Sequence, residues 1–565
     1  MATIQPIVDS TVPRPSRWAA WFGRFEAWLE RVADRFNPIL VKECRQALKS
    51  RQFTITFALV LGCCWLWSIY GVMMVGPGVH FSTGSAGLRM FSGYFAIMAF
   101  PLLVVVPHGA FRSLADERDD RTFELLSITA LGPRQIVAGK LGSAMVQMLV
   151  YLSAITPCLA FTYLLRGIEV PTIMILVIYM FFGSLGLSMV ALLAATLAQE
   201  RHWQTLWSAA VVLGLVVLFF FVVGTGIEGI TRERIPYESP GFWYANVGLG
   251  LAFGSYFALF FLAAAARLTF PSENRSTPLR IVMLVQQLLL TFGVAWGIAH
   301  QITSSNEFRD IAVFEILSVF LSVLPFHWYF MGLFMIGEMP RLSNRAKRRL
   351  PQSFLGRAFF TWFNPGPASG YVFAVANLAS GMVLLLAAIA VWAGSQTSPR
   401  VTTPNPARFG SSGNDMWQII YLCLLAFGYV AFYLGLGRLV LGLLRRVAPV
   451  GMFLGVLIQV LLLLIGCIAP VLIDELAGDH RYEYSLLYVY NPPATFAAVG
   501  RQMVTGGSET VILIVVCSAL AMFLANLRGI AEELRQVRAE APRRVIEEEE
   551  ALHPKPVVVP INPFE

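Results

Sequence analysis

Twelve long apolar runs divide this sequence, and no other feature restricts its possible folds so strongly. Each has about 20 mainly apolar residues, the length that an α-helix needs to cross a bilayer. Without water to bind the backbone polar groups, such runs must form helices or a closed barrel. The runs are 53–75, 90–111, 141–165, 171–198, 205–227, 243–266, 279–300, 311–337, 371–394, 415–443, 449–473 and 510–527, the last being the shortest. The sequence therefore predicts an all-α polytopic membrane protein with about 12 transmembrane helices.

The composition also favours a bilayer over water as the solvent of this chain. Its 565 residues are 56% hydrophobic and 13% charged, whereas soluble domains carry roughly 25% charged residues. The net charge of +8 is explained by orientation in a membrane, so no nucleic-acid partner is expected. Seven cysteines are present, and all but Cys44 fall inside apolar runs without metal-type spacing. We interpret them as small apolar residues with no disulfide framework.

The distribution of Lys and Arg predicts the orientation of the chain. If the N-terminus is cytoplasmic and the runs alternate in direction, 33 of the 42 basic residues fall inside and 9 outside. This split follows the positive-inside rule. We therefore expect a multi-pass protein of the plasma (inner) membrane. Its two termini, residues 112–140 and residues 338–370 should all be cytoplasmic.

We expect four parts along the chain. Residues 1–52 form cytoplasmic or interfacial helices, 53–270 and 271–527 form two units of six spans each, and 528–565 form a cytoplasmic tail. The tail is partly disordered in this prediction, because an acidic run and several prolines end it. The second six-span unit is either a degenerate repeat of the first or unrelated to it.

Two helices are predicted before the first span. Residues 17–36 place aromatic side chains at helical spacing with arginines between them, which is typical of an amphipathic helix lying in the membrane interface. Packing of this helix against other protein is the alternative. Asn37 is a suitable cap and Pro38 a suitable first residue for the next helix.

Catalytic and nucleotide-binding motifs are absent from the sequence. The glycines of GPRQIVAGKL, at residues 132–141, lack phosphate-loop spacing, and no HExxH, GxSxG or CxxC occurs. Charges and histidines in or near the spans are scarce: Glu315, Arg438, His108 and His327. Glu315 could serve an ion-coupled carrier or simply mark an outer helix end. The sequence thus predicts a channel or carrier body that is no enzyme and binds no cofactor.

A charged segment, residues 115–140, lies between the second and third runs. Glu117 and Arg121 are four residues apart in the favourable helical order, and Gly132-Pro133 indicates a turn before the third span. An ordinary charged loop is one interpretation of this segment.

The same segment resembles the pattern that permease subunits of type-2 ABC transporters carry after their second span. The matching residues are Glu117-Arg118, Thr122, Glu124-Leu125-Leu126, Thr129, Ile136-Val137 and Gly139-Lys140. Arg121 and Ala130 depart from it, replacing a glycine and a proline. Residues 37–51 resemble the interfacial helix that opens such permeases, so the resemblance covers residues 37–140.

The resemblance implies a transport subunit that couples to a separate ATP-binding ABC subunit, which would hydrolyse the ATP. Its implied coupling residues are Glu117, Arg118, Thr122, Glu124 and Arg134. The expected function is ATP-driven transport, by export, of an unidentified substrate across the lipid bilayer. Either a homodimer or a single chain with two permease halves would complete the pathway. An ion-coupled secondary transporter and a non-transporting membrane scaffold are the alternatives.

A weak internal similarity links the two halves. SPGFWYANVG, at 239–248, aligns without gaps with NPPATFAAVG, at 491–500, so that Pro240 meets Pro492 and Gly248 meets Gly500. Short re-entrant helices occupy this place in the family, so both segments could cap the path outside the cytoplasm; chance similarity is the alternative. The second half has no copy of the coupling pattern, and its basic loop 338–370 is either a degenerate coupling surface or an anchor to anionic lipid.

Overall fold

The computed structural model describes residues 37–74, 86–119, 131–165, 167–197, 201–232, 235–270, 273–303, 309–338, 343, 347–348, 350–351, 353–396, 413–447, 452–477, 484–500, 507–535 and 542–552. Within these ranges the regular elements are all helices. Eleven of them, together with the continuous helical run of residues 86–119, make twelve stretches that are long and apolar enough to cross a membrane. The predicted all-α polytopic fold is therefore confirmed, whereas the amphipathic helix predicted at 17–36 lies outside the described residues.

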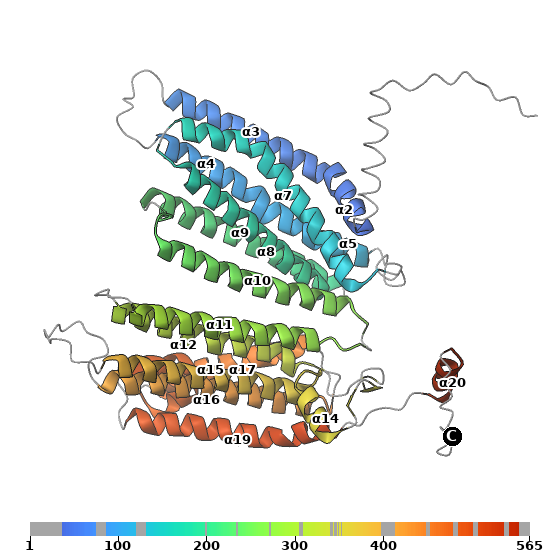
Figure 1. Cartoon of the computed structure of the whole chain (residues 1–565), viewed down its shortest axis with the longest axis vertical. Coiled ribbons are helices and arrows are strands. Elements are labelled where there is room, and N and C mark those ends of the chain that lie inside the picture. The colour runs from blue at the N-terminus through green and yellow to red at the C-terminus, as the bar shows by residue number, and fades with distance from the viewer. Residues whose placement is uncertain are drawn as a thin grey trace, which may run out of the picture. The chain divides into compact units, whose positions relative to one another are not determined.

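The chain divides into two compact units, Met1–Leu268 and Thr269–Glu565. Within each unit the long helices run side by side (Figure 1). Unit 1 contains α2 (Pro38–Lys49), α3 (Arg51–Met74), α4 (Ala86–Phe100), η1 (Pro101–Val105), α5 (Val106–Asp119), α7 (Pro133–Leu164), α8 (Val170–Leu197), α9 (Arg201–Arg232) and α10 (Pro240–Leu268).

The second span of unit 1 forms the centre of its bundle. It consists of α4, the π-helical turn η1 and α5 in direct succession, and 61% of its apolar stretch is buried. Pro101, which begins η1, has no backbone N–H to donate, a common cause of such local irregularity. Met98 and Leu102 of this span are fully buried in one apolar cluster with Met148 and Tyr151 of α7.

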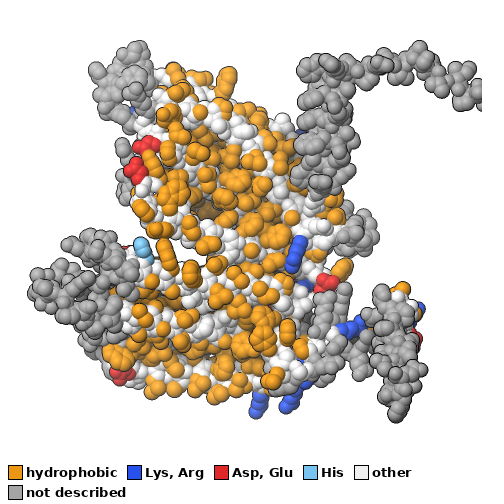
Figure 2. Space-filling model, in the orientation of Figure 1, with side chains coloured by type: hydrophobic (Ala, Val, Ile, Leu, Met, Phe, Trp, Pro, Cys, Tyr) orange, Lys and Arg blue, Asp and Glu red, His pale blue; other side chains and the backbone are white. Residues whose placement is uncertain are grey.

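The outer helices of unit 1 keep most of their apolar side chains on the surface. The buried share of the apolar stretch is 17% in α3, 6% in α9 and 11% in α10. Apolar side chains accordingly cover the face seen in Figure 2. Hydrocarbon tails are as apolar as these side chains, so a bilayer solvates such faces without cost.

Unit 2 repeats the plan of six long helices, with additional short ones. Its elements are α11 (Thr277–Thr303), α12 (Arg309–Ile336), α14 (Phe354–Thr361), α15 (Pro367–Gln396), α16 (Gly413–Leu444), α17 (Met452–Ala477), η2 (Leu486–Tyr490), α18 (Pro492–Gly500), α19 (Ser508–Leu534) and α20 (Arg543–Leu552). The central helix is α16, which packs against α12, α15, α17 and α19. In α16, 56% of the apolar stretch is buried.

Candidate coupling site

The short helix α2 lies directly against the start of α7. Asn37 caps α2, since its side chain accepts a hydrogen bond from the Ile39 amide at 3.1 Å, and Pro38 is the first helical residue, as predicted. The Asn37 amide also donates to the carbonyl of Gln135 in α7. A Cβ on Gly139 would lie 2.8 Å from the side chain of Ile39. The glycine of the Gly-Lys pair therefore allows the two helices to approach closely.

Lys140, the next residue of α7, forms the centre of a buried ion cluster. Its ammonium group lies 3.0 Å from the Glu43 carboxylate of α2 and 3.0 Å from the Glu117 carboxylate of α5. It also donates to the backbone carbonyl of Ser113 at 2.8 Å. Two of the three N–H donors of this lysine form the hydrogen bonds to Glu43 and Ser113, and the contact with Glu117 is an ion pair. One side chain thus holds α2, α5 and α7 together.

Burial makes the loss of any one partner of this cluster costly. The side chains of Lys140, Glu43 and Glu117 are 1%, 9% and 14% exposed. Lys42, which is 59% exposed, adds a second cation 3.2 Å from Glu117, so the four side chains balance in charge. Removing one partner of a buried ion pair costs about 3–5 kcal/mol, because the other charge is left without compensation. The cluster therefore joins the middle of α2, the end of α5 and the start of α7 into one block.

The predicted coupling residues have different positions relative to this block. Glu117 belongs to the cluster. Arg134 lies exposed in the first turn of α7. Arg118 lies in α5, but its side chain is outside the described part of the chain, as are Thr122 and Glu124. Of the five residues, the structure thus joins one to the cluster and leaves one on the surface nearby.

Sequence reasoning did not identify the two residues that complete the cluster. The coupling pattern contains Lys140 but gives it no role, and it does not contain Glu43. Both are nearly fully buried, yet they lie 97 positions apart in the sequence. One signal could have indicated a distant partner. Glu43 is the single acidic residue of a basic helix, and the basic residues Lys42 and Arg45 lie on the exposed face of that helix.

Cys44 of α2 lies beside Ser143 of α7, so its chemical reactivity depends on the packing of these two helices. Its thiol is half-buried, and burial raises its pKa, with the neighbouring Glu43 carboxylate acting in the same direction and a hydrogen bond with Ser143 opposing them. The reactive thiolate is therefore scarce at neutral pH. The reactivity of this cysteine should depend on whether α2 stays docked.

Unit 2 contains a similar arrangement where its second span ends and its third begins. Arg280 of α11, whose side chain is 1% exposed, donates to the Glu338 carboxylate at 2.7 Å. Glu338 follows α12 and also accepts from the Gly366 amide, at 2.8 Å, just before α15. The residues of the coupling pattern are not repeated in unit 2. In both units, however, a carboxylate at the end of the second span pairs with a buried cation: Glu117 with Lys140 in unit 1, and Glu338 with Arg280 in unit 2.

A second carboxylate binds the start of α15. Glu533, near the end of α19, accepts hydrogen bonds from the amides of Ala368 and Ser369, both at 2.8 Å. The first N–H groups of a helix have no partner within it, and its N-terminus carries partial positive charge. The carboxylate of Glu533 accepts from two of these N–H groups and places a negative charge at the positive end of the helix. It thereby connects α19 to α15.

The two segments with similar sequences differ in structure. Pro240 begins α10, and Gly248 lies within this continuous helix. Pro492–Gly500 instead form the separate short helix α18. The hydroxyl of Tyr429 in α16 donates to the Val489 carbonyl, at 2.6 Å, just before α18. Irregular backbone at membrane depth requires such partners from the protein.

The charged residues and histidines noted near the spans have different environments. Glu315 is exposed on α12, and Arg438 of α16 donates to the backbone carbonyl of Asn526 at 3.0 Å. His108 belongs to unit 1 and His327 to unit 2. In the described part of the chain, His, Cys, Asp and Glu side chains form no group of three that could hold a metal ion.

Comparisons with protein-family models, with curated proteins and with solved structures find no match to this chain.

Proposed function

We propose that this chain is the membrane-spanning permease subunit of an ATP-driven ABC transporter, which exports its substrate with energy from separate ATPase subunits. The observation that carries this proposal is the Lys140 cluster. Glu117 and Lys140 both belong to the pattern that resembles the coupling element of type-2 ABC permeases, and their charged groups lie 3.0 Å apart. A coupling element needs such a rigid connection to the spans.

In the proposed mechanism, closure of the ATPase subunits pushes on residues 112–140 from the cytoplasmic side. The displacement passes to the second and third spans because the Lys140 ammonium joins α5 to α7 and both to α2. Separating these charges in a buried site costs several kcal/mol, so the block transmits a push instead of deforming. Glu117 acts as a brace in this mechanism, and Arg134 lies at the hinge where α7 begins.

ATP binds the partner subunit in this proposal, since the sequence has no phosphate loop. The first test is therefore ATP hydrolysis by the purified chain and by the complex isolated from its native membranes. The complex should hydrolyse ATP and the isolated chain should not. An ion-coupled carrier or a scaffold would copurify with no ATPase, and hydrolysis by the isolated chain would also contradict the proposal.

The second test addresses coupling. In the reconstituted complex, Glu124→Ala should lower transport-linked ATP hydrolysis at least about fivefold, since coupling elements bias an equilibrium by about 1–3 kcal/mol. Glu475→Ala, an exposed glutamate at the end of α17, is the matched control and should leave hydrolysis unchanged. Charge reversal of Lys347-Arg348-Arg349, interpreted as a lipid anchor, should have a smaller effect than Glu124→Ala. The reverse order would place the coupling surface in the second half.

A further inference from the structure

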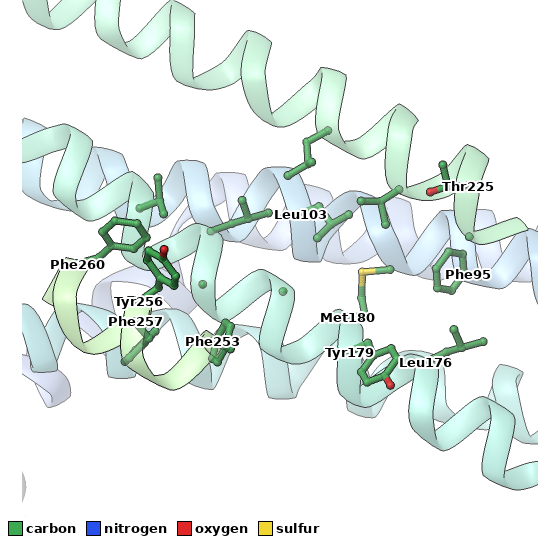
Figure 3. Close-up of a pocket in the computed structure, with 17 residues that line it drawn as sticks. Phe95, Leu103, Leu176, Tyr179, Met180, Thr225, Phe253, Tyr256, Phe257 and Phe260 are labelled. Carbon is green, nitrogen blue, oxygen red and sulfur yellow. The ribbon is translucent and has the colours of Figure 1, made fainter. Parts of the chain in front are cut away.

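Unit 1 contains an elongated apolar cavity of about 570 Å³ between its spans. Its walls come from α4, η1, α8, α9 and α10, and the described residues lining it include no charged side chain. Phe95, Met180 and Phe253 are among them, and Figure 3 shows these side chains directed into one continuous space. The space-filling view has a hollow among the apolar side chains of unit 1 (Figure 2). Ligand pockets commonly have volumes of about 300–1,000 Å³.

The shape of the cavity suits a long, thin ligand. Along α8 its lining extends from Leu176 to Val190, which corresponds to about 21 Å at the helical rise of 1.5 Å per residue. The hydrocarbon core of a bilayer is about 30 Å thick, so one leaflet contributes about 15 Å. The cavity is therefore longer than the hydrocarbon region of one leaflet. The aromatic side chains Tyr256, Phe257 and Phe260 line it at the end away from Leu176 and Tyr179 (Figure 3).

The lining contains three hydroxyl groups, those of Tyr179, Thr225 and Tyr256, and two of them have hydrogen-bond partners outside it. The hydroxyl of Thr225 donates to the carbonyl of Phe221 at 2.8 Å. The hydroxyl of Tyr179 donates to the side chain of Asn246. Water in a cavity needs about 2–4 polar partners, and a polar ligand needs comparable ones. The lining therefore disfavours both and favours hydrocarbon.

We propose that this cavity binds one hydrocarbon chain of a membrane lipid. The cavity is partly open, since Tyr179 and Val190 of its lining are exposed, so a lipid chain has access to it once the helices are inserted. Without an occupant its walls would forfeit dispersion contacts. A lipid chain restores those contacts and needs no hydrogen bond. The proposal does not depend on the proposed transport function.

Gly183 of α8 provides a way to fill the cavity without disturbing its walls. It lines the cavity, and a Cβ added there would meet no atom within 4 Å. The variant Gly183→Phe should therefore occupy the space that the lipid chain would use. Gly214 of α9 is exposed, does not line the cavity and likewise has open space around an added Cβ. Gly214→Phe is thus the matched control.

The experiment uses the full chain in lipid nanodiscs that contain a phosphatidylcholine with a photoreactive diazirine in the middle of one acyl chain. After illumination, peptide mass spectrometry measures the label on residues 176–190 and 253–260. The label on α3, whose Leu59 and Trp65 are exposed, serves as the reference for ordinary lipid contact. No ATP or partner subunit is needed, so failure here leaves the transport proposal intact, and failure of that proposal leaves this site intact.

In the wild-type chain the lining should be labelled more strongly than α3. Gly183→Phe should lower the ratio of lining label to α3 label at least about tenfold, equivalent to about 1.4 kcal/mol of binding, and Gly214→Phe should not change it. If Gly183→Phe does not yield folded protein, Gly183→Leu replaces it in the same comparison. A wild-type ratio at or below that of α3, or equal ratios in all folded variants, would overturn the proposal.

Discussion

The ammonium group of Lys140 lies 3.0 Å from the carboxylate of Glu117, and these two residues border the charged segment between the second and third spans. The ion pair therefore holds the end of α5 against the start of α7. Any force applied between them reaches two membrane helices together. The Glu43 carboxylate, also 3.0 Å from Lys140, adds α2 to the same connection.

The first prediction concerns the stability of this connection. Lys140→Met should destabilise the folded chain by about 3–5 kcal/mol, because Glu43 and Glu117 would be left buried around a side chain without charge. Lys42→Met should cost at most about 1 kcal/mol, since an exposed ion pair contributes little. The midpoints of thermal unfolding in the same detergent provide the measurement. Equal shifts for the two variants would contradict the burial argument.

The second prediction concerns the docking of α2. In a chain whose other six cysteines are replaced, Cys44 should react slowly with a maleimide at pH 7, because its raised pKa keeps the thiol protonated. The rate should increase with pH as the thiolate forms. Gly139→Leu should increase it at pH 7, since a side chain there collides with Ile39.

The matched control for this experiment is Gly109→Leu. Gly109 lies in α5, where an added Cβ would meet no atom within 4 Å, so Cys44 should keep its slow rate. Rapid labelling of Cys44 in the otherwise unchanged chain would show that α2 is not held against α7.

The third prediction concerns the start of α15. Glu533→Ala should lower stability by about 1–3 kcal/mol, because the amides of Ala368 and Ser369 lose their acceptors in a partly buried site. Glu533→Gln should cost less, since one amide oxygen remains. The neighbouring Glu532 is exposed, so Glu532→Ala should leave the unfolding midpoint within about 0.5 kcal/mol of the unchanged chain.

The fourth prediction concerns topology and derives from the distribution of basic residues, 33 inside and 9 outside. Cysteines introduced at positions 85 and 404 should react with a membrane-impermeant maleimide in intact cells. A cysteine at position 345 should react only after the membrane is opened. Reaction at 345 from outside would be incompatible with twelve alternating spans.

The sequence was sufficient to predict the helices, because the bilayer imposes a simple requirement on them. Every stretch that crosses it must be apolar and hydrogen-bonded within itself, so hydropathy alone located all twelve spans. The start of α2 was also predictable, since Asn37 and Pro38 act on their immediate neighbours.

The ion clusters were not predictable in the same way. Glu43 and Lys140 meet only because α2 packs across α7, and no local pattern contains that contact. The last span was predicted to end at residue 527, yet α19 continues to Leu534. The glutamates near its end lower the local hydropathy, which predicts an earlier end of the span. The helix nevertheless continues, because the charge of Glu533 is stabilised by the N-terminal amides of α15, which are distant in sequence.

That contact has a consequence for biosynthesis. Ala368 and Glu533 are 165 residues apart, and a ribosome adds about 5–20 residues per second, so the start of α15 waits roughly 10–30 s for its carboxylate after it is made. The described contacts of the Lys140 cluster, in contrast, all lie within unit 1. A chain released before Glu533 is made would therefore contain the Lys140 cluster but lack the acceptor for the amides of Ala368 and Ser369.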